Sequence, residues 1–200
     1  MFPTLEAGPM TDLNTITGTL FEPGDIVELR CIKGKAPDAQ IKKLWTTAEA
    51  LPSMHGELHR LNEQGFNIYY GPNPRKEFGK SGDDNVLLAR CLFCDFDNVE
   101  PGDGCGMFEF VHTDIFLAGL PEETMAVHSG HGIHVYWRLS EPILDLSQWK
   151  RTQEKLNRRL GADVTIKNPE RIMRMPGFMN TKEKPYQDCF ICWSPLHADR

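Results

Sequence analysis

Short runs of apolar residues, separated by polar and glycine-rich stretches, predict strands and helices in the first half of the chain. Residues 26–32 alternate between apolar and polar side chains and predict a strand, and residues 66–70 predict a second one. Between them we expect a helix that starts near Lys42, is interrupted at Pro52 and continues to about Gln64. The polar, glycine-containing residues 75–85 indicate a surface loop.

The second half of the chain carries the longest apolar run. Apolar side chains in residues 86–94 occupy both faces, which is typical of a strand covered on both sides. The elements expected further on are a helix over residues 107–117, paired strands over 124–128 and 132–139, a helix over 144–160, a helical turn over 169–173 and a strand over 189–193. Because strands and helices mix without strict βαβ alternation, the predicted fold class is α+β.

Composition and charge exclude several classes of protein. The chain has 200 residues, 40% of them hydrophobic, so it can bury one good core or two small lobes. No stretch approaches about eighteen consecutive apolar residues, and the first residues do not resemble a signal peptide, so we expect a cytoplasmic protein with no membrane partner. The net charge is −6, yet residues 150–184 hold ten Lys and Arg against four Asp and Glu. This segment suits either an anionic partner on one side or a solvated helix face.

Two pairs of cysteines have the C-x-x-C spacing that often binds zinc. Both pairs, Cys91/Cys94 and Cys189/Cys192, lie in predicted strands. Residues three apart on a strand point to opposite faces, so neither pair can bind one zinc ion without breaking its strand. We therefore expect reduced, buried cysteines and no structural zinc.

The strongest chemical signal is the pair Asp95 and Asp97 at the end of the apolar run. Alternation on a strand points both carboxylates to the same face. Two carboxylates at the exit of a buried strand are unfavourable unless a cation compensates them, and Mg²⁺ or Mn²⁺ suits such oxygen ligands. Alternatively, the pair simply ends a strand and begins a turn.

A second motif starts at Ser129 and contains two glycines before a histidine. On a strand, the residues that share one face are Gly130, Gly132, His134 and Tyr136. Absent glycine side chains would let a bulky anion lie against backbone N–H groups, with Ser129 and His134 as further donors. That arrangement suits a triphosphate, and the alternative is a hairpin with an incidental core histidine.

A third motif combines one acid with several cations. Asp163 is followed by Arg171 and Arg174, which a helical turn would align on one side. Asn180 and Lys182 come after a Pro-Gly turn. Cations close to a lone acid make sense if they bind phosphates while Asp163 joins a metal site, although arginines on a solvated helix would look the same.

In this order, the three motifs resemble the archaeo-eukaryotic primase superfamily, the primase–polymerases. The family pattern is Asp-x-Asp on a strand, then Ser-x-His or a glycine-expanded version of it, and then a third carboxylate. The matching positions are Asp95, Asp97, Ser129, His134 and Asp163. The ordered set is more specific than any of its parts.

Two further stretches are similar to the branch with RepB-type primase domains, found in plasmids, phages and CRISPR-associated loci. They are residues 174–182 and 73–75. The resemblance implies a primase catalytic core over residues 26–200, in which a small αβ lobe (about 26–90) is fused to a module like an RNA-recognition motif with the active site (about 86–200). Residues 1–25 would be a poorly defined N-terminal extension.

The resemblance also implies an activity, namely template-directed nucleotidyl transfer by a DNA primase, a DNA polymerase or both. Asp95, Asp97 and Asp163 would hold two divalent ions, Mg²⁺ or Mn²⁺. The implied partners are ribo- or deoxyribonucleoside triphosphates, a DNA (or RNA) template and primer, and an accessory helicase or helical priming domain beyond residue 200. The residues implied to bind the nucleotide are Ser129, Gly130, Gly132, His134, Tyr136, Arg75, Arg171, Arg174, Asn180 and Lys182.

Two other functions stay open at the level of sequence. A catalytically silent replication initiator or nucleic-acid-binding module on the same fold would bind DNA without incorporating nucleotides. A metal-dependent nuclease could use the same paired aspartates.

Overall fold

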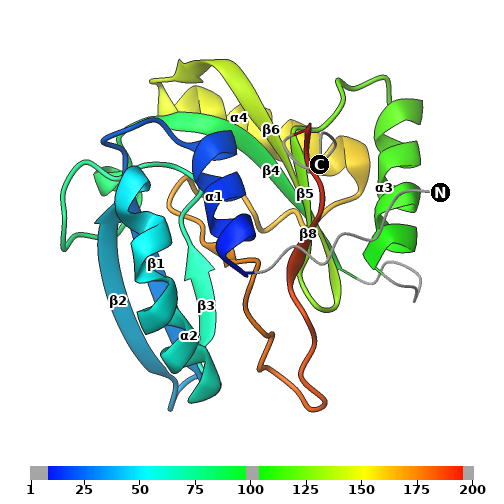
Figure 1. Cartoon of the computed structure of the whole chain (residues 1–200). Helices are drawn as coiled ribbons and strands as arrows, with labels where there is room; N and C mark the ends of the chain where they lie inside the picture. The colour runs from blue at the N-terminus through cyan, green and yellow to red at the C-terminus, as the bar shows by residue number, and fades with distance from the viewer. Residues whose placement is uncertain (1–8, 98–103, 196–200) are drawn as a thin grey trace.

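The computed structural model describes residues 9–97 and 104–195, which form two antiparallel sheets with helices packed against them (Figure 1). The helices are α1 (Pro9–Leu20), α2 (His55–Glu63), α3 (Gly104–Leu117) and α4 (Leu146–Leu160), with 3-10 turns at Ala48–Met54 and Asp83–Asn85. The strands are β1 (Ile26–Lys33), β2 (Gln40–Thr47), β3 (Asn67–Tyr70), β4 (Ala89–Asp97), β5 (Met125–His128), β6 (Gly132–Ile143), β7 (Met173–Arg174) and β8 (Phe190–Trp193). The predicted α+β class is confirmed.

The first sheet has the order β2-β1-β3-β7. Its last strand is only two residues long and comes from a distant part of the sequence. Tyr69 of β3 pairs with Arg174 of β7, and Tyr70 pairs with Met173. This short pairing joins a segment from the C-terminal half of the chain to the N-terminal sheet.

The second sheet has the order β4-β6-β5-β8, and it buries both of its faces. Alternate residues of β6, among them Ile133 and Val135, pack with α3 in one core. The opposite face, including Phe93 of β4 and Tyr136 of β6, joins a larger core with α1, α2 and the first sheet. Cys91 lies in the larger core and Cys94 in the smaller one, as the alternation of strand side chains requires.

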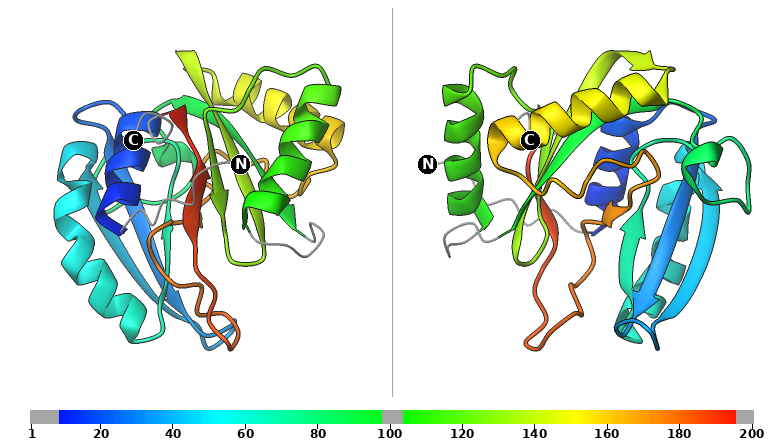
Figure 2. Two further views of the ribbon diagram at one scale, coloured as in Figure 1. Left: turned by 45° about the vertical axis from the view of Figure 1, so that its right-hand side comes forward. Right: turned by 180° about the vertical axis from the view of Figure 1, so that it is seen from behind.

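Strand β4 lies at an edge of the second sheet, and α4 runs beside it (Figure 2, right). Side chains of α4 satisfy backbone groups on that open edge. Trp149 donates its ring N–H to the carbonyl oxygen of Cys91 at 2.9 Å, and Gln153 bonds both the N–H and the carbonyl oxygen of Phe93. These contacts explain why an otherwise charged, amphipathic helix buries a glutamine.

The predicted helix from Lys42 is wrong over its first part. Residues 40–47 form β2, paired with β1 along its whole length, and α2 begins only at His55 after a 3-10 turn that contains Pro52. Half of the side chains of β2, an edge strand, are exposed, and only Thr46 is buried. Without a buried face, the strand leaves no period-two pattern in the sequence.

Two further expectations differ from the structure. In place of the helical turn over residues 169–173 there is one tight turn at residues 168–171, closed by a 3.1 Å bond from the N–H of Arg171 to the carbonyl oxygen of Asn168, and β7 follows at Met173. The N-terminal extension contains α1, whose Leu13, Ile16 and Leu20 are fully buried. Helix α1 contacts β8 of the second sheet and α2, so it helps to join the two halves of the core.

Candidate active site

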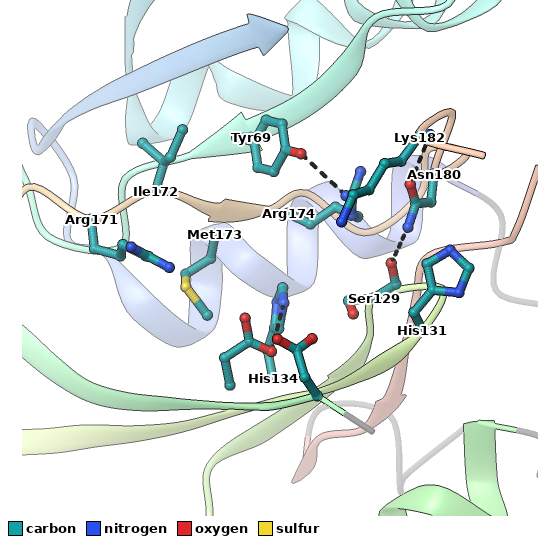
Figure 3. Close-up of a pocket in the computed structure, with 12 residues that line it drawn as sticks. Tyr69, Ser129, His131, His134, Arg171, Ile172, Met173, Arg174, Asn180 and Lys182 are labelled. Carbon is teal, nitrogen blue, oxygen red and sulfur yellow. Dashed lines mark hydrogen bonds and ion pairs between the residues drawn. The ribbon is translucent and has the colours of Figure 1, made fainter. Parts of the chain in front are cut away.

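A cavity of about 270 Å³ opens where β4 and the β5–β6 turn face β3 and β7 (Figure 3). Its lining residues are Tyr69, Asp95, Asp97, Ser129, His131, His134, Arg171, Ile172, Met173, Arg174, Asn180 and Lys182. Eight of these twelve are candidates from the sequence motifs. The cavity therefore brings the three motifs together, with acids on β4 and cations on and around β7.

Strand β4 supplies the acidic pair. Burial, and then the charge of Asp163, raise the pKa of Asp95 to about 6. The charge of Asp95 is the main cause of the raised pKa of Asp97. Oδ1 of Asp95 is buried and accepts no hydrogen bond. A divalent cation would fit this pair of oxygen donors, because it would give the buried oxygen a partner and relieve the repulsion between the carboxylates.

Asp163 reaches the same place from the end of α4. Its backbone N–H donates to the carbonyl oxygen of Asp95 at 3.0 Å, on the open edge of β4. Its carboxylate accepts hydrogen bonds of 2.8 Å from both the N–H and the hydroxyl of Thr165, and lies 3.6 Å from the guanidinium of Arg171. Among residues 9–97 and 104–195, no three His, Cys, Asp or Glu side chains are grouped as ligands of one ion. Asp163 is thus beside the acidic pair, with its carboxylate held by Thr165.

His134 lies directly across β6 from Asp95. Its Nε2 is 3.6 Å from Oδ1 of Asp95, and its Nδ1 is buried without a hydrogen-bond partner. Burial, followed by the charge of Arg174, lowers the pKa of His134 to about 3. The ring is therefore neutral at physiological pH and offers hydrogen bonds rather than positive charge.

The two glycines of the second motif do not form an open floor. A Cβ at Gly130, where φ is +96°, would lie 2.8 Å from the side-chain nitrogen of Asn180. A Cβ at Gly132 would collide with the carbonyl oxygen of Phe96. The glycines thus allow neighbouring segments to approach closely. Ser129 does line the cavity, and its hydroxyl donates to the carbonyl oxygen of Gly132 at 3.2 Å.

Arg174 is fixed in the cavity wall by the first sheet. Its Nη2 donates to the hydroxyl of Tyr69 at 3.1 Å, and its Nη1 donates to Oδ1 of Asn67. Its guanidinium also lies 4.9 Å from the centre of the Tyr69 ring. Arg171 lines the cavity as well, although no helical turn aligns the two arginines.

Asn180 links two other parts of the wall. Its Nδ2 donates to the carbonyl oxygen of Ser129 at 3.0 Å, and its Oδ1 accepts from the backbone N–H of Lys182 at 3.1 Å. Because both ends of this 2% exposed side chain are engaged, Asn180 holds the Ser129 turn against the Lys182 segment. Lys182 and Ser129 then project into the cavity (Figure 3).

Five sequence candidates are not among the residues that line the cavity: Asp163, Gly130 and Gly132, described above, and Arg75 and Tyr136. Arg75 is buried, with its Nε 2.8 Å from Oε2 of Glu28. Tyr136 is also fully buried, and its ring centre lies 6.2 Å from that of Phe93 and 6.5 Å from that of Tyr70. Strand alternation correctly places Tyr136 on the same face of β6 as His134. At Tyr136, however, the larger core covers this face, so the side chain does not reach the cavity.

Four residues of the wall are not among the sequence candidates: Tyr69, His131, Ile172 and Met173. A strand that began at Gly130 would place His131 on the apolar face with Ile133, but β6 begins only at Gly132, so His131 is exposed in the turn. The other three depend on the pairing of β3 with β7. Nothing in a single sequence indicates that a two-residue strand will pair there.

Part of the chain matches a known protein family. Residues 119–192 match the family described as the RepB DNA-primase N-terminal domain. A replication protein of Clostridium perfringens is 29% identical over 141 residues, which covers 65% of this chain and 33% of the relative. The chain therefore spans about a third of the length of that curated relative.

Solved structures of primases share the fold. The AEP domain of the cyanophage S-2L primase–polymerase matches with a TM-score of 0.64 and 22% identity, over 94% of each chain. The catalytic domain of primase RepB′, solved in complex with initiator DNA, matches with a TM-score of 0.69 and 15% identity, over 94% of this chain and 86% of that one. The expected resemblance to the archaeo-eukaryotic primases is confirmed, and the chain has the fold of their catalytic domains. Within the described residues, no helix has the length and apolar character that crossing a membrane requires.

Proposed function

We propose that this primase-fold chain is a template-directed nucleotidyltransferase, a DNA primase, a DNA polymerase or both, with its active site in the cavity between the two sheets. One observation carries the proposal. Asp95 and Asp97 line the same cavity as Arg171, Arg174 and Lys182. An acidic pair opposite three cations suits a metal-bound triphosphate, since each group then meets the opposite charge.

The cationic wall would bind the phosphates of the incoming nucleotide. Arg174 is already oriented by Tyr69 and Asn67, so it loses little conformational freedom on binding an anion. Neutral His134 and the hydroxyl of Ser129 would add hydrogen bonds to phosphate oxygens without adding charge. Because this wall exists before the ligand arrives, it orients the triphosphate relative to the acidic pair.

Asp95 and Asp97 would hold divalent ions, Mg²⁺ or Mn²⁺, and Asp163 would join them by exchanging its bonds to Thr165 for the metal. Bound there, the ions would activate the attacking hydroxyl and stabilise the pyrophosphate that leaves. The position of its backbone favours this role, because the N–H of Asp163 is already bonded to the carbonyl oxygen of Asp95. The raised pKa of Asp95 falls when a cation sits beside it, so metal binding keeps this carboxylate ionised.

A primer-extension assay with Mg²⁺ or Mn²⁺ tests the proposal. The wild-type protein should extend a labelled primer on a DNA template, and Asp95→Asn with Asp97→Asn should lower the rate at least about a thousandfold while the protein stays folded. Asp114→Asn is a matched control, because it removes one charge from an exposed position on α3.

The same assay separates the other two functions. If the wild-type protein binds the template but incorporates no nucleotide, the chain is a catalytically silent initiator module. Metal-dependent shortening of the primer in the absence of nucleotides would identify a nuclease. Retained extension by the double variant would place the chemistry elsewhere in the chain.

A further inference from the structure

Arg75 lies outside the cavity, in a buried network of charges. Its Nε donates to Oε2 of Glu28 at 2.8 Å, and both side chains are fully buried. Oε1 of Glu28 accepts from Nε of Arg30 and from the hydroxyl of Ser81, each at 2.7 Å. Burial alone would raise the pKa of Glu28, but the hydrogen bonds from Arg30, Ser81 and Arg75 more than offset it and hold the pKa below its usual value. The carboxylate is therefore ionised and fully satisfied.

The network extends from the first lobe to the segment before β7. Nη2 of Arg30 donates to Oε2 of Glu170 at 2.9 Å, and the same oxygen accepts from the backbone N–H of Gly82 at 2.8 Å. Nη2 of Arg75 donates to the backbone carbonyl oxygen of Glu170 at 3.0 Å. Glu170 is thus held through its side chain by one arginine and through its backbone by the other.

Further bonds hold the backbone on either side of Arg171. Asn73 donates to the carbonyl oxygen of Pro169 at 3.2 Å, and the N–H of Glu170 donates to a carboxylate oxygen of Asp83 at 3.1 Å. Past Arg171, the chain is fixed again where β7 pairs with β3. Only residues 171 and 172 lie between these two anchors, so the direction in which Arg171 leaves the backbone depends on where Glu170 is held.

The packing around Arg75 leaves little room for another arrangement. A Cβ placed on Gly71 would collide with Nη2 and Cζ of Arg75. Nη1 of Arg75 donates to the carbonyl oxygen of Asn73 at 3.0 Å, so every nitrogen of the guanidinium has a partner. A glycine at position 71 is what lets the guanidinium bind Glu28 and Glu170 at once.

We propose that Arg75, Glu28, Arg30 and Glu170 form a clamp that positions Arg171 for the phosphates of the nucleotide. These are positioning residues, since they touch neither the cavity nor its ligand, and the role rests on the nucleotide site proposed above. The clamp explains why the ion pair of Glu28 and Arg75 is fully buried beside the half-buried pair of Arg30 and Glu170. Removing one partner of a buried ion pair is strongly destabilising, so the test needs mild substitutions.

Glu170→Gln is the main test variant. It keeps the backbone bond to Arg75 and the size of the side chain, and it removes the charge that Arg30 binds. Gly71→Ala is the second variant, because it pushes Arg75 without changing any charge. Glu63→Gln is the matched control, since it neutralises an exposed glutamate on α2 whose partner His59 is also exposed.

Hydrogen exchange without any ligand tests the clamp itself, whether or not the protein is a polymerase. Glu170→Gln and Gly71→Ala should each speed amide exchange in residues 170–174 about tenfold, and Glu63→Gln should leave it unchanged. Exchange that stays at the wild-type rate in both variants would overturn the clamp. Failure of the wild-type protein to incorporate nucleotides would overturn the proposed function and leave this measurement valid.

The coupling to Arg171 tests the positioning role. Glu170→Gln should raise the KM for the nucleotide about fivefold with little change in kcat, and should add almost nothing in an Arg171→Ala background. A general loss of structure would lower kcat and would act equally in both backgrounds. Equal effects of Glu170→Gln with and without Arg171 would therefore refute the positioning role, even if exchange in residues 170–174 is faster.

Discussion

Asp12→Asn is expected to stabilise the protein at neutral and alkaline pH and to have little effect in acid. Asp12 lies in α1 and is only 1% exposed. Neither of its carboxylate oxygens accepts a hydrogen bond of normal geometry. Burial raises the pKa of Asp12 from 3.8 to about 7, and the backbone amide of Ile191 offsets only part of this rise. The folded protein therefore favours the protonated, neutral acid.

The sign of the effect follows from the two pKa values. Between pH 4 and pH 7 the folded state holds a proton on Asp12 that the unfolded chain has released, so stability falls as the pH rises through this range. The shift of about three pH units corresponds to about 4 kcal/mol of unfolding free energy, present below pH 4 and lost above pH 7. Relaxation of the core around the charge would reduce this figure. Asparagine has nearly the same volume and no charge, so the free energy of unfolding of the variant does not fall in this way as the pH rises.

Urea denaturation between pH 4 and pH 8 measures the prediction. The free energy of unfolding of Asp12→Asn should exceed that of the wild type by an amount that grows as the pH rises. This difference should level off above pH 7. Asp114→Asn serves as the control, because that aspartate is exposed on α3. If the wild-type and Asp12→Asn curves run parallel over the whole range, the carboxyl of Asp12 is not buried as a neutral acid.

Three further substitutions test particular contacts. Gly132→Ala should lower the free energy of unfolding by about 2 kcal/mol, because its Cβ would meet the carbonyl oxygen of Phe96. An unchanged midpoint of urea denaturation would contradict this close approach. Tyr136→Phe should change stability by less than about 1 kcal/mol and leave the ratio of ribo- to deoxyribonucleotide use unchanged, since the hydroxyl is buried beside that of Tyr70 and away from the cavity. An altered ratio would show that Tyr136 contacts the sugar of the nucleotide. Tyr69→Phe should raise the KM for the nucleotide about fivefold by freeing one nitrogen of Arg174, and an unchanged KM would show that this hydrogen bond does not orient the arginine.

Strand alternation made much of the fold and part of the site predictable. It placed Asp95 and Asp97 on one face of β4, and it placed His134 on the cavity side of β6 with Val135 in the core. These inferences succeeded because successive side chains of a strand point to opposite faces, whatever covers those faces. The fold followed from the same strands together with the order of the motifs.

Other features depend on contacts between distant segments, which alternation does not encode. Strand β7 exists because two residues pair with β3, and Asp163 lies beside β4 because its N–H completes the open edge of that strand. Arg75 was expected at the cavity because the family resemblance implied a nucleotide contact, yet its partner is Glu28, a buried residue of β1. Charge in a sequence shows that a partner is needed, and only the folded chain shows whether that partner is a ligand or another side chain.

A crystal soaked with Mn²⁺ and a non-hydrolysable nucleoside triphosphate tests the central claim most directly. We predict manganese bound by Asp95 and Asp97, with Asp163 turned from Thr165 to the metal and the phosphates lying against Arg174. A triphosphate bound elsewhere, or no manganese at the acidic pair while Asp163 keeps its bonds to Thr165, would contradict nucleotidyl transfer in this cavity.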